Sequence, residues 1–183
     1  MKSCFTAELT TACAILFIWV GCAHAPAAPC ATPPPFHVTV VTGARLNPDA
    51  MGRSLPTLVR VLQLKGTTRL EDADFAGVFS RAADVLGEDL VRTDEFTVDP
   101  DSSDSRWIER DPKAAHVVAV GVFRQPTGTQ WRSAVALGPV EPSLCNPQAL
   151  NRIGTPRWGD AVLSFKMQDF AIESAATRAE ASR

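Results

Sequence analysis

The sequence predicts a mainly β fold, a two-sheet β-sandwich of about eight short strands with one helix inserted among them. Apolar and polar residues alternate with a period of two in several short segments, as they do in strands that bury one face. Turn-forming segments such as 99–104 and 125–129 separate these runs, and many short strands divided in this way are typical of a sandwich. One stretch, residues 75–86, carries its apolar residues at helical spacing instead.

The alternating segments define the expected strands. The run 115–123 is apolar on both faces, which indicates a central strand covered on both sides. The segment that follows it, Gln125-Pro126-Thr127-Gly128-Thr129, favours a hairpin to the next run. The expected strands are Phe36–Val40, Thr57–Leu64, Leu90–Val98, Ser105–Arg110, Ala115–Phe123, Trp131–Leu137, Ala161–Phe165 and Phe170–Ser174.

The predicted helix has an apolar stripe, and such a stripe belongs to the core more often than to a binding site. We therefore expect Phe79, in the middle of the stripe, to be buried. Thr68 and Glu71 fit a capping box for this helix or for a short turn before it, and Gly87 fits the position after the last turn. Three carboxylates between residues 71 and 74 suit a helix start, where the dipole favours negative charge. The stripe consists of Phe75, Val78, Phe79, Ala82, Ala83 and Leu86.

Residues 1–21 read as a secretory signal peptide. Lys2 supplies a minimal positive start, and the apolar run 11–20 is shorter than the roughly 20 residues of a spanning helix. Trp19-Val20-Gly21-Cys22 looks like a lipobox, whose cysteine is acylated and becomes the mature N-terminus, although leucine is usual where Trp19 stands. The alternative is an ordinary signal peptide cleaved near residues 23–28. Ala23, in place of the aspartate that commonly signals inner-membrane retention, favours the outer membrane and a periplasmic protein.

The mature chain is expected to have three parts. Residues 22–35 are the lipidated Cys22 and a tether, because residues 23–35 contain five prolines and five alanines, which favours an extended chain. Residues 36–174 form the sandwich domain, and residues 175–183 form a flexible tail. Two cysteines remain after signal removal and lipidation, Cys30 and Cys145, and they could pair in an oxidising compartment.

Residues that support catalysis or bind metals do not gather in a known spacing. His24, His37 and His116 have neither a second histidine nor a cysteine pair at the spacing of a zinc site. The acidic run 99–104 fails the EF-hand pattern and reads as a solvated hairpin turn. With 18 basic and 20 acidic residues, a net charge of −2 and no basic stripe, nucleic-acid binding has no support. We therefore expect a binding module with no catalytic residue, no cofactor, no metal and no small-molecule substrate.

The connection Gly43–Pro56 between the first two strands is unusually long. It has fourteen residues, whereas hairpin loops usually have two to five. Its composition is not that of a disordered segment, since Met51 and Leu55 are apolar and Asn47-Pro48-Asp49 sets a turn. Two interpretations are open: an Ω-loop folded against its own sandwich, or a contact surface for a protein partner.

Several motifs, in order along the chain, resemble the TssJ (SciN/VasD) family of type VI secretion lipoproteins. The series covers most of residues 36–137 and is more specific than any one of its members. Cys22 in its lipobox belongs to the same pattern, and the resemblance weakens after residue 137. The motifs are Leu46-Asn47-Pro48-Asp49, Gly52-Arg53, Pro56, the strand 59–65, Ala73-Asp74-Phe75, residues 86–90, Glu95, the strand 117–124 and Trp131-Arg132.

This resemblance implies a transthyretin-like β-sandwich, anchored in the outer membrane, within the type VI secretion membrane complex. Such lipoproteins bind the periplasmic C-terminal domain of the inner-membrane protein TssM and help to assemble the envelope-spanning channel. The family's loop between the first two strands carries partner contacts, and by motif this loop is Gly43–Pro56. We expect three of its residues only to shape the loop, Asn47, Pro48 and Gly52, and five to touch the partner, Leu46, Asp49, Met51, Arg53 and Leu55.

Two other classes of function remain open from the sequence. A lipid-anchored envelope- or carbohydrate-binding sandwich unrelated to secretion would expose aromatic residues on a sheet face, and Trp107, Trp131 and Trp158 could serve. A periplasmic hydrolase with a site assembled from scattered residues is the other class.

Overall fold

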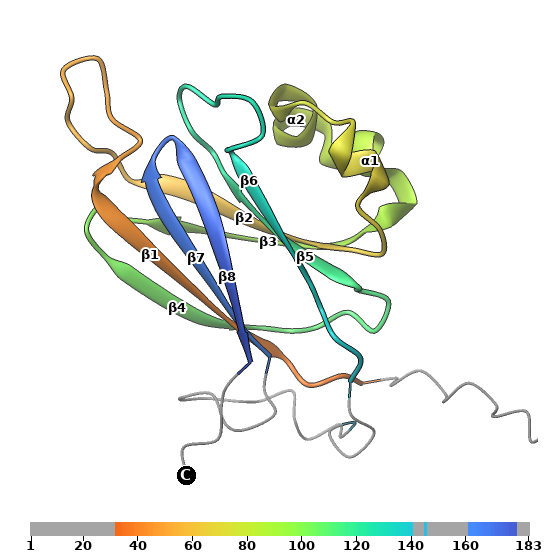
Figure 1. Ribbon diagram of the computed structural model, residues 1–183. Coiled ribbons are helices and arrows are strands. Elements are labelled where there is room, and N and C mark those ends of the chain that lie inside the picture. Colours follow the sequence, from red (N-terminus) through yellow and green to blue (C-terminus); the bar gives the residue numbers. More distant parts are fainter. Residues whose placement is uncertain (1–31, 141–144, 146–160, 179–183) are drawn as a thin grey trace, which may run out of the picture.

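The computed structural model describes residues 32–140, 145 and 161–178, which form two four-stranded sheets packed face to face (Figure 1). One sheet has the strand order β4-β1-β7-β8 and the other β3-β2-β5-β6. The strands are β1 (Phe36–Leu46), β2 (Thr57–Leu64), β3 (Leu90–Val98), β4 (Ser103–Ile108), β5 (His116–Gly121), β6 (Arg132–Ala136), β7 (Ala161–Asp169) and β8 (Ala171–Arg178). The predicted eight-stranded, two-sheet sandwich with an inserted helical element is confirmed.

The two sheets share one apolar core between their inner faces. Neighbouring strands are antiparallel, except that β1 runs parallel to β7. In β8, the backbone N–H of Ile172 donates to the carbonyl of Gln130, in the β5–β6 connection of the other sheet, at 2.8 Å. The core includes the fully buried Phe36, Val38, Val40, Val59, Val61, Val117, Ala119 and Met167.

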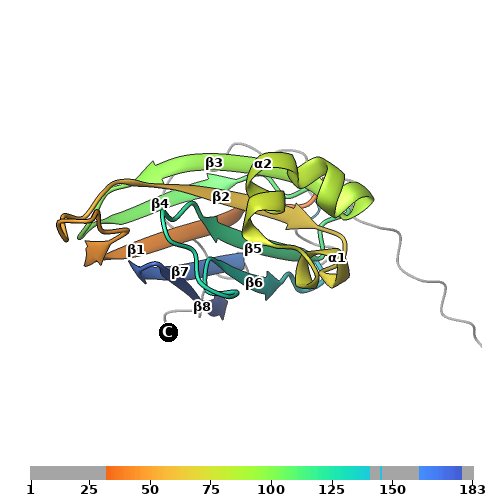
Figure 2. The ribbon, with the colours of Figure 1, turned by 90° about the horizontal axis from the view of Figure 1, so that it is seen from above.

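The chain between β2 and β3 forms helices that cover the outer face of the β3-β2-β5-β6 sheet (Figures 1 and 2). They are α1 (Thr68–Glu71), α2 (Phe75–Leu86) and a 3-10 turn, η1 (Gly87–Asp89). Because of this cover, β5 is buried on both faces, as its sequence predicts. Val118 and Val120 lie opposite Leu62 and Arg60 of β2, and Arg60 hydrogen-bonds to α2. Trp131 packs edge-on against Phe75 of α2, with the ring centroids 5.5 Å apart.

The ends of α2 are capped by residues that the sequence only partly identifies. Asp74 is the N-cap, and its Oδ1 accepts a hydrogen bond from the Gly77 N–H at 2.7 Å. Gly87 ends the helix with a φ of 53°, as expected for a glycine after the last turn. The expected capping box of Thr68 and Glu71 forms neither at α2 nor at the turn before it, α1, whose N-cap is Thr67 and has no side-chain cap hydrogen bond. Glu71 instead accepts a hydrogen bond from the Thr67 hydroxyl at 2.9 Å.

The predicted apolar stripe of α2 is only partly buried, and the expectation for Phe79 is wrong. Arg81 has non-helical dihedral angles (φ −144°, ψ 45°), so the helix is kinked and its apolar face changes direction. Val78 and Leu86 are fully buried, whereas Phe79 is 43% exposed and stacks on Phe75. The guanidinium of Arg60 donates to the Phe79 carbonyl at 2.5 Å, so a charged side chain holds α2 on the sheet beside the kink.

Three segment boundaries differ from the sequence-based expectation. The acidic connection 99–102 is not a hairpin turn, because β3 and β4 lie at the edges of different sheets and the chain crosses between them. β8 continues to Arg178, into the segment expected to be a flexible tail. Residues 33–35, expected to belong to the tether, are buried against the fold.

We expect Phe79→Ala to lower the free energy of unfolding by about 1–2 kcal/mol, because a half-exposed ring loses only part of the roughly 3–5 kcal/mol of a buried one. The matched substitution Leu86→Ala, at a fully buried position of the same helix, should cost about 2–5 kcal/mol. Urea denaturation of both variants measures the difference. A loss at Phe79 equal to or larger than the loss at Leu86 would contradict this account of the helix.

Candidate partner-binding loop

The connection between β1 and β2 is the segment Asn47–Pro56, which projects from one end of the sandwich (Figure 1). The expected loop, Gly43–Pro56, is longer than the observed one because residues 43–46 belong to β1. Leu46 pairs with Asp169 of β7 after a shift in register. Since β1 and β2 lie in different sheets, this loop is a crossover and not a hairpin. It lies at the opposite end of the sandwich from residue 32, where the described chain begins.

Asn47 fixes the base of the loop. Its side chain is 4% exposed, and its backbone adopts the left-handed conformation with a φ of 46°, which asparagine tolerates better than most residues. Its N–H donates to the Asp169 carbonyl at 2.7 Å, and its Oδ1 accepts from the Arg124 N–H at 2.8 Å. One residue therefore ties the β1–β2 loop to the β7–β8 turn and to the β5–β6 connection.

Asp49 organises the tip of the loop. Its Oδ1 accepts from the backbone N–H groups of Met51 and Arg53 at 2.8 and 2.9 Å, and its Oδ2 lies 2.8 Å from Arg53 Nε. Hydrogen bonds from the backbone and then the side chain of Arg53 hold the pKa of the Asp49 carboxyl below its ordinary value. Gly52 closes the turn with a φ of 78°, a conformation that favours glycine.

The last residues of the loop are hydrogen-bonded back to β1. The Leu55 N–H donates to the Leu46 carbonyl at 3.0 Å, and the Ser54 hydroxyl donates to the Ala44 carbonyl at 2.6 Å. The base, the tip and the return segment are thus each held by hydrogen bonds. A loop held in this way loses little conformational entropy when it binds a partner.

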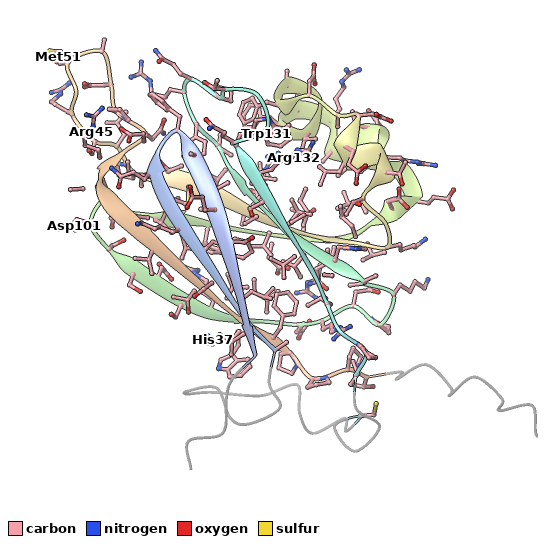
Figure 3. The ribbon with its side chains drawn as sticks, viewed as in Figure 1. His37, Arg45, Met51, Asp101, Trp131 and Arg132 are labelled. Atoms are coloured by element: carbon pink, nitrogen blue, oxygen red, sulfur yellow. The ribbon has the colours of Figure 1, made fainter. Side chains whose placement is uncertain are left out.

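The structure separates the eight predicted loop residues into two groups. Leu46 is fully buried and Asn47 nearly so, and the expectation that Leu46 touches a partner is therefore wrong: it is a core residue at the end of β1. Both carboxylate oxygens of Asp49 accept hydrogen bonds from other residues of the loop. The most exposed side chains are those of Met51, 73% exposed at the tip of the loop (Figure 3), and Arg53, 71% exposed. Pro48, Gly52 and Leu55 complete the exposed or half-buried surface of the loop.

Sequence reasoning missed Arg45, whose side chain is 72% exposed beside the loop and forms an ion pair with Asp169 at 3.1 Å. It also missed the hydrogen bond between Asn47 and Arg124. The alternation of β1 could have indicated an outward Arg45 if the strand had been extended to Leu46. No local pattern could have indicated a contact between residues 77 positions apart.

Other candidate sites receive little support within the described residues. No three His, Cys, Asp or Glu side chains gather to bind a metal in this part of the chain. Trp131 is 2% exposed and its Nε1 donates to the Gly128 carbonyl at 2.8 Å, so it cannot serve a carbohydrate surface. Trp107 is half-buried with its ring against His37, and Trp158 lies outside the described residues.

The predicted lipidation site, Cys22, lies outside the described residues, as do the signal peptide and Cys30. Cys145 is disulfide-bonded, and its pairing with Cys30 stays a prediction. In the ranges that the structure describes, no helix is long and apolar enough to span a membrane.

Residues 34–151 match the model of a protein family described as "Type VI secretion lipoprotein, VasD, EvfM, TssJ". This segment spans more than half of the chain and includes the β1–β2 loop. The chain belongs to this type VI secretion lipoprotein family. Comparison with curated proteins found no match.

Several solved structures have a fold similar to that of this chain. The T6SS lipoprotein TssJ1 from Pseudomonas aeruginosa is similar with a TM-score of 0.64 and 22% identity, over 81% of this chain and 99% of that one. Serratia marcescens Lip, a membrane-bound component of the type VI secretion system, gives a TM-score of 0.61 and 19% identity, over 78% and 98%. A chain in the structure "T6SS protein TssM C-terminal domain" from EAEC gives 0.58 and 16%, over 79% and 99%.

Three substitutions test the role of Asn47. We expect Asn47→Asp to be the least destabilising of the three, because it keeps the acceptor for the Arg124 N–H, although its carboxylate is partly desolvated at this 4% exposed position. Asn47→Gly keeps the left-handed backbone but loses the acceptor and should cost about 1–3 kcal/mol. Asn47→Ala loses the acceptor and adds backbone strain, so it should cost more than Asn47→Gly. Urea denaturation measures the free energies of unfolding. Equal stabilities of the Asp, Gly and Ala variants would contradict the role of Asn47 in fixing the base of the loop.

Proposed function

We propose that this protein is an outer-membrane-anchored periplasmic lipoprotein of a type VI secretion membrane complex. In this proposal it binds the periplasmic domain of a TssM-like inner-membrane protein through the β1–β2 loop and helps to assemble the envelope-spanning channel. The observation that carries the proposal is the hydrogen-bonded loop Asn47–Pro56, which presents an exposed methionine and an exposed arginine at one end of the sandwich. Membership of the secretion lipoprotein family supplies the context.

The direction in which the loop points supports this proposal. The described chain begins at residue 32, and the proposed lipid anchor, Cys22, lies ten residues before it in the sequence. The loop lies at the opposite end of the sandwich (Figure 1). With the anchor in the outer membrane, the loop points away from that membrane, towards a partner that rises from the inner one.

The chemistry of the loop also suits a protein partner. Met51 is a flexible apolar side chain that adapts to irregular pockets. Arg53 adds a planar, charged group, and arginine is enriched among the residues that dominate binding energies. Both exposed side chains at the tip are therefore of types that contribute to protein–protein contacts.

Cys22→Ser should release the protein from the membrane fraction. In the proposal the Cys22 thiol carries the acyl chains, and without them nothing anchors the protein stably in the membrane. Fractionation of cells, followed by a high-salt wash, measures the distribution. Cys30→Ser serves as the control and should stay with the outer membrane. Sedimentation of Cys22→Ser with the outer membrane after the wash would show that another segment holds the protein.

Met51→Asp should weaken binding of the TssM-like periplasmic domain by about thirtyfold or more, because it places a charge at the apolar tip of the loop. The side chain is 73% exposed, so the fold should be unchanged. Val41→Asp is the matched control, at a 43% exposed apolar position on β1 outside the loop, and it should bind as the wild type does. Isothermal titration calorimetry gives the affinities, and an unchanged affinity for Met51→Asp would remove the loop tip from the interface.

A further inference from the structure

We propose that the β5–β6 connection, residues 122–131, forms the second half of the partner-binding surface, and that Arg124 binds a carboxylate on the partner. The partner face would then have acidic groups beside an apolar pocket for Met51. This inference rests on the proposed function, and it adds a second binding element and the chemical character of the surface that the protein recognises.

The two connections form one surface. The Arg124 N–H donates to Asn47 Oδ1 at 2.8 Å, so the base of the β1–β2 loop and the start of the β5–β6 connection are in direct contact. The Val122 N–H donates to the Leu58 carbonyl at 2.9 Å, close to where β2 begins. In two perpendicular views, both connections lie at the same end of the sandwich (Figures 1 and 2). A partner that covers the exposed tip of one loop therefore meets the neighbouring connection.

The fold fixes the backbone of Arg124 and leaves its side chain in solvent. The preceding residue, Phe123, is 3% exposed, and its ring meets that of Phe170 edge-on with centroids 6.4 Å apart. Arg124 itself is exposed, and its guanidinium has no ion pair within the described chain. By contrast, Arg45 and Arg53 pair with Asp169 and Asp49. A guanidinium on a fixed backbone with no internal partner is suited to an acceptor on another molecule.

The charges at this end of the sandwich favour an acidic partner surface on the side of Arg124. Arg45, Arg53 and Arg124 lie on or beside the base and tip of the β1–β2 loop, and two aspartates, Asp169 and Asp49, pair with the first two of them. Asp101 approaches from the other side of β1, where its N–H donates to the Gly43 carbonyl at 3.2 Å. The unpaired positive charge therefore lies towards the β5–β6 connection, although the whole chain has a net charge of −2. Such local complementarity determines partner choice and association rate more than the net charge does.

The test is charge reversal in the mature, full-length protein. Arg124→Glu should weaken binding of the TssM-like periplasmic domain by about tenfold or more, slow association, and reduce the dependence of the association rate on salt. Lys113→Glu is the matched control with the same change in charge. Lys113 is exposed and lies beyond the other end of β2, where the Ala115 N–H donates to the Leu64 carbonyl. Surface plasmon resonance at several salt concentrations measures both variants, with circular dichroism to confirm their fold.

The outcomes separate this inference from the proposed function. Weakened binding by Arg124→Glu, with Lys113→Glu unchanged, supports the composite surface. If Met51→Asp abolishes binding and Arg124→Glu binds as the wild type does, the inference is overturned and the proposed function stands. If neither variant affects binding, the proposed function is overturned with it. An equal loss for Lys113→Glu would show a general effect of net charge and would also overturn the assignment of Arg124.

Discussion

β1 ends in one sheet and β2 begins in the other, and the form of the candidate site follows from this constraint. The chain has to cross the end of the sandwich directly after Leu46, which is the last fully buried residue of β1. A tight two-residue turn joins adjacent antiparallel strands and cannot make this crossing. The chain turns at Asn47 in the left-handed conformation and leaves the core. The projecting loop is therefore a consequence of the topology, and hydrogen bonds at its base and tip give it a defined shape.

Most strands could be predicted because each of them carries its own signal. The alternation in residues 36–40 reflects burial of one face, and residues 57–64 are rich in β-branched and aliphatic side chains. Both patterns are visible without any knowledge of neighbouring strands. The assignment of strands to sheets is a property of distant segments, so the hairpin expected at residues 99–104 was wrong. The end of β1 was missed for a related reason. Leu46 pairs with Asp169 of β7 only after a register shift that spans residues 43–45, and the composition of this stretch alone resembles that of a loop.

The same distinction holds for α2 and for the candidate site. Helical spacing predicted the helix, but the kink at Arg81 and the contact of Arg60 with the Phe79 carbonyl depend on residues about twenty positions apart. Phe79 lies beside this kink and is 43% exposed, against the expectation from the stripe. For the loop, the sequence identified Met51 and Arg53, which are exposed, together with Leu46 and Asp49, which serve the internal structure. Burial and hydrogen bonding, which separate these roles, come from tertiary structure.

In the proposed arrangement, the burial of residues 33–35 against the domain limits how far the binding loop can lie from the outer membrane. With Cys22 in the outer membrane, only residues 23–32 separate the anchor from the fold, and ten fully extended residues span at most about 33–36 Å. The eleven residues of β1 then carry the chain a further ~36 Å along the sandwich to the loop. Residues 33–35 add at most about 11 Å, so the base of the loop can lie no deeper than about 80 Å below the outer membrane. A partner anchored in the inner membrane has to bridge the remaining distance with its own structure, and lengthening the segment 23–32 would change the envelope spacing at which the two proteins can meet.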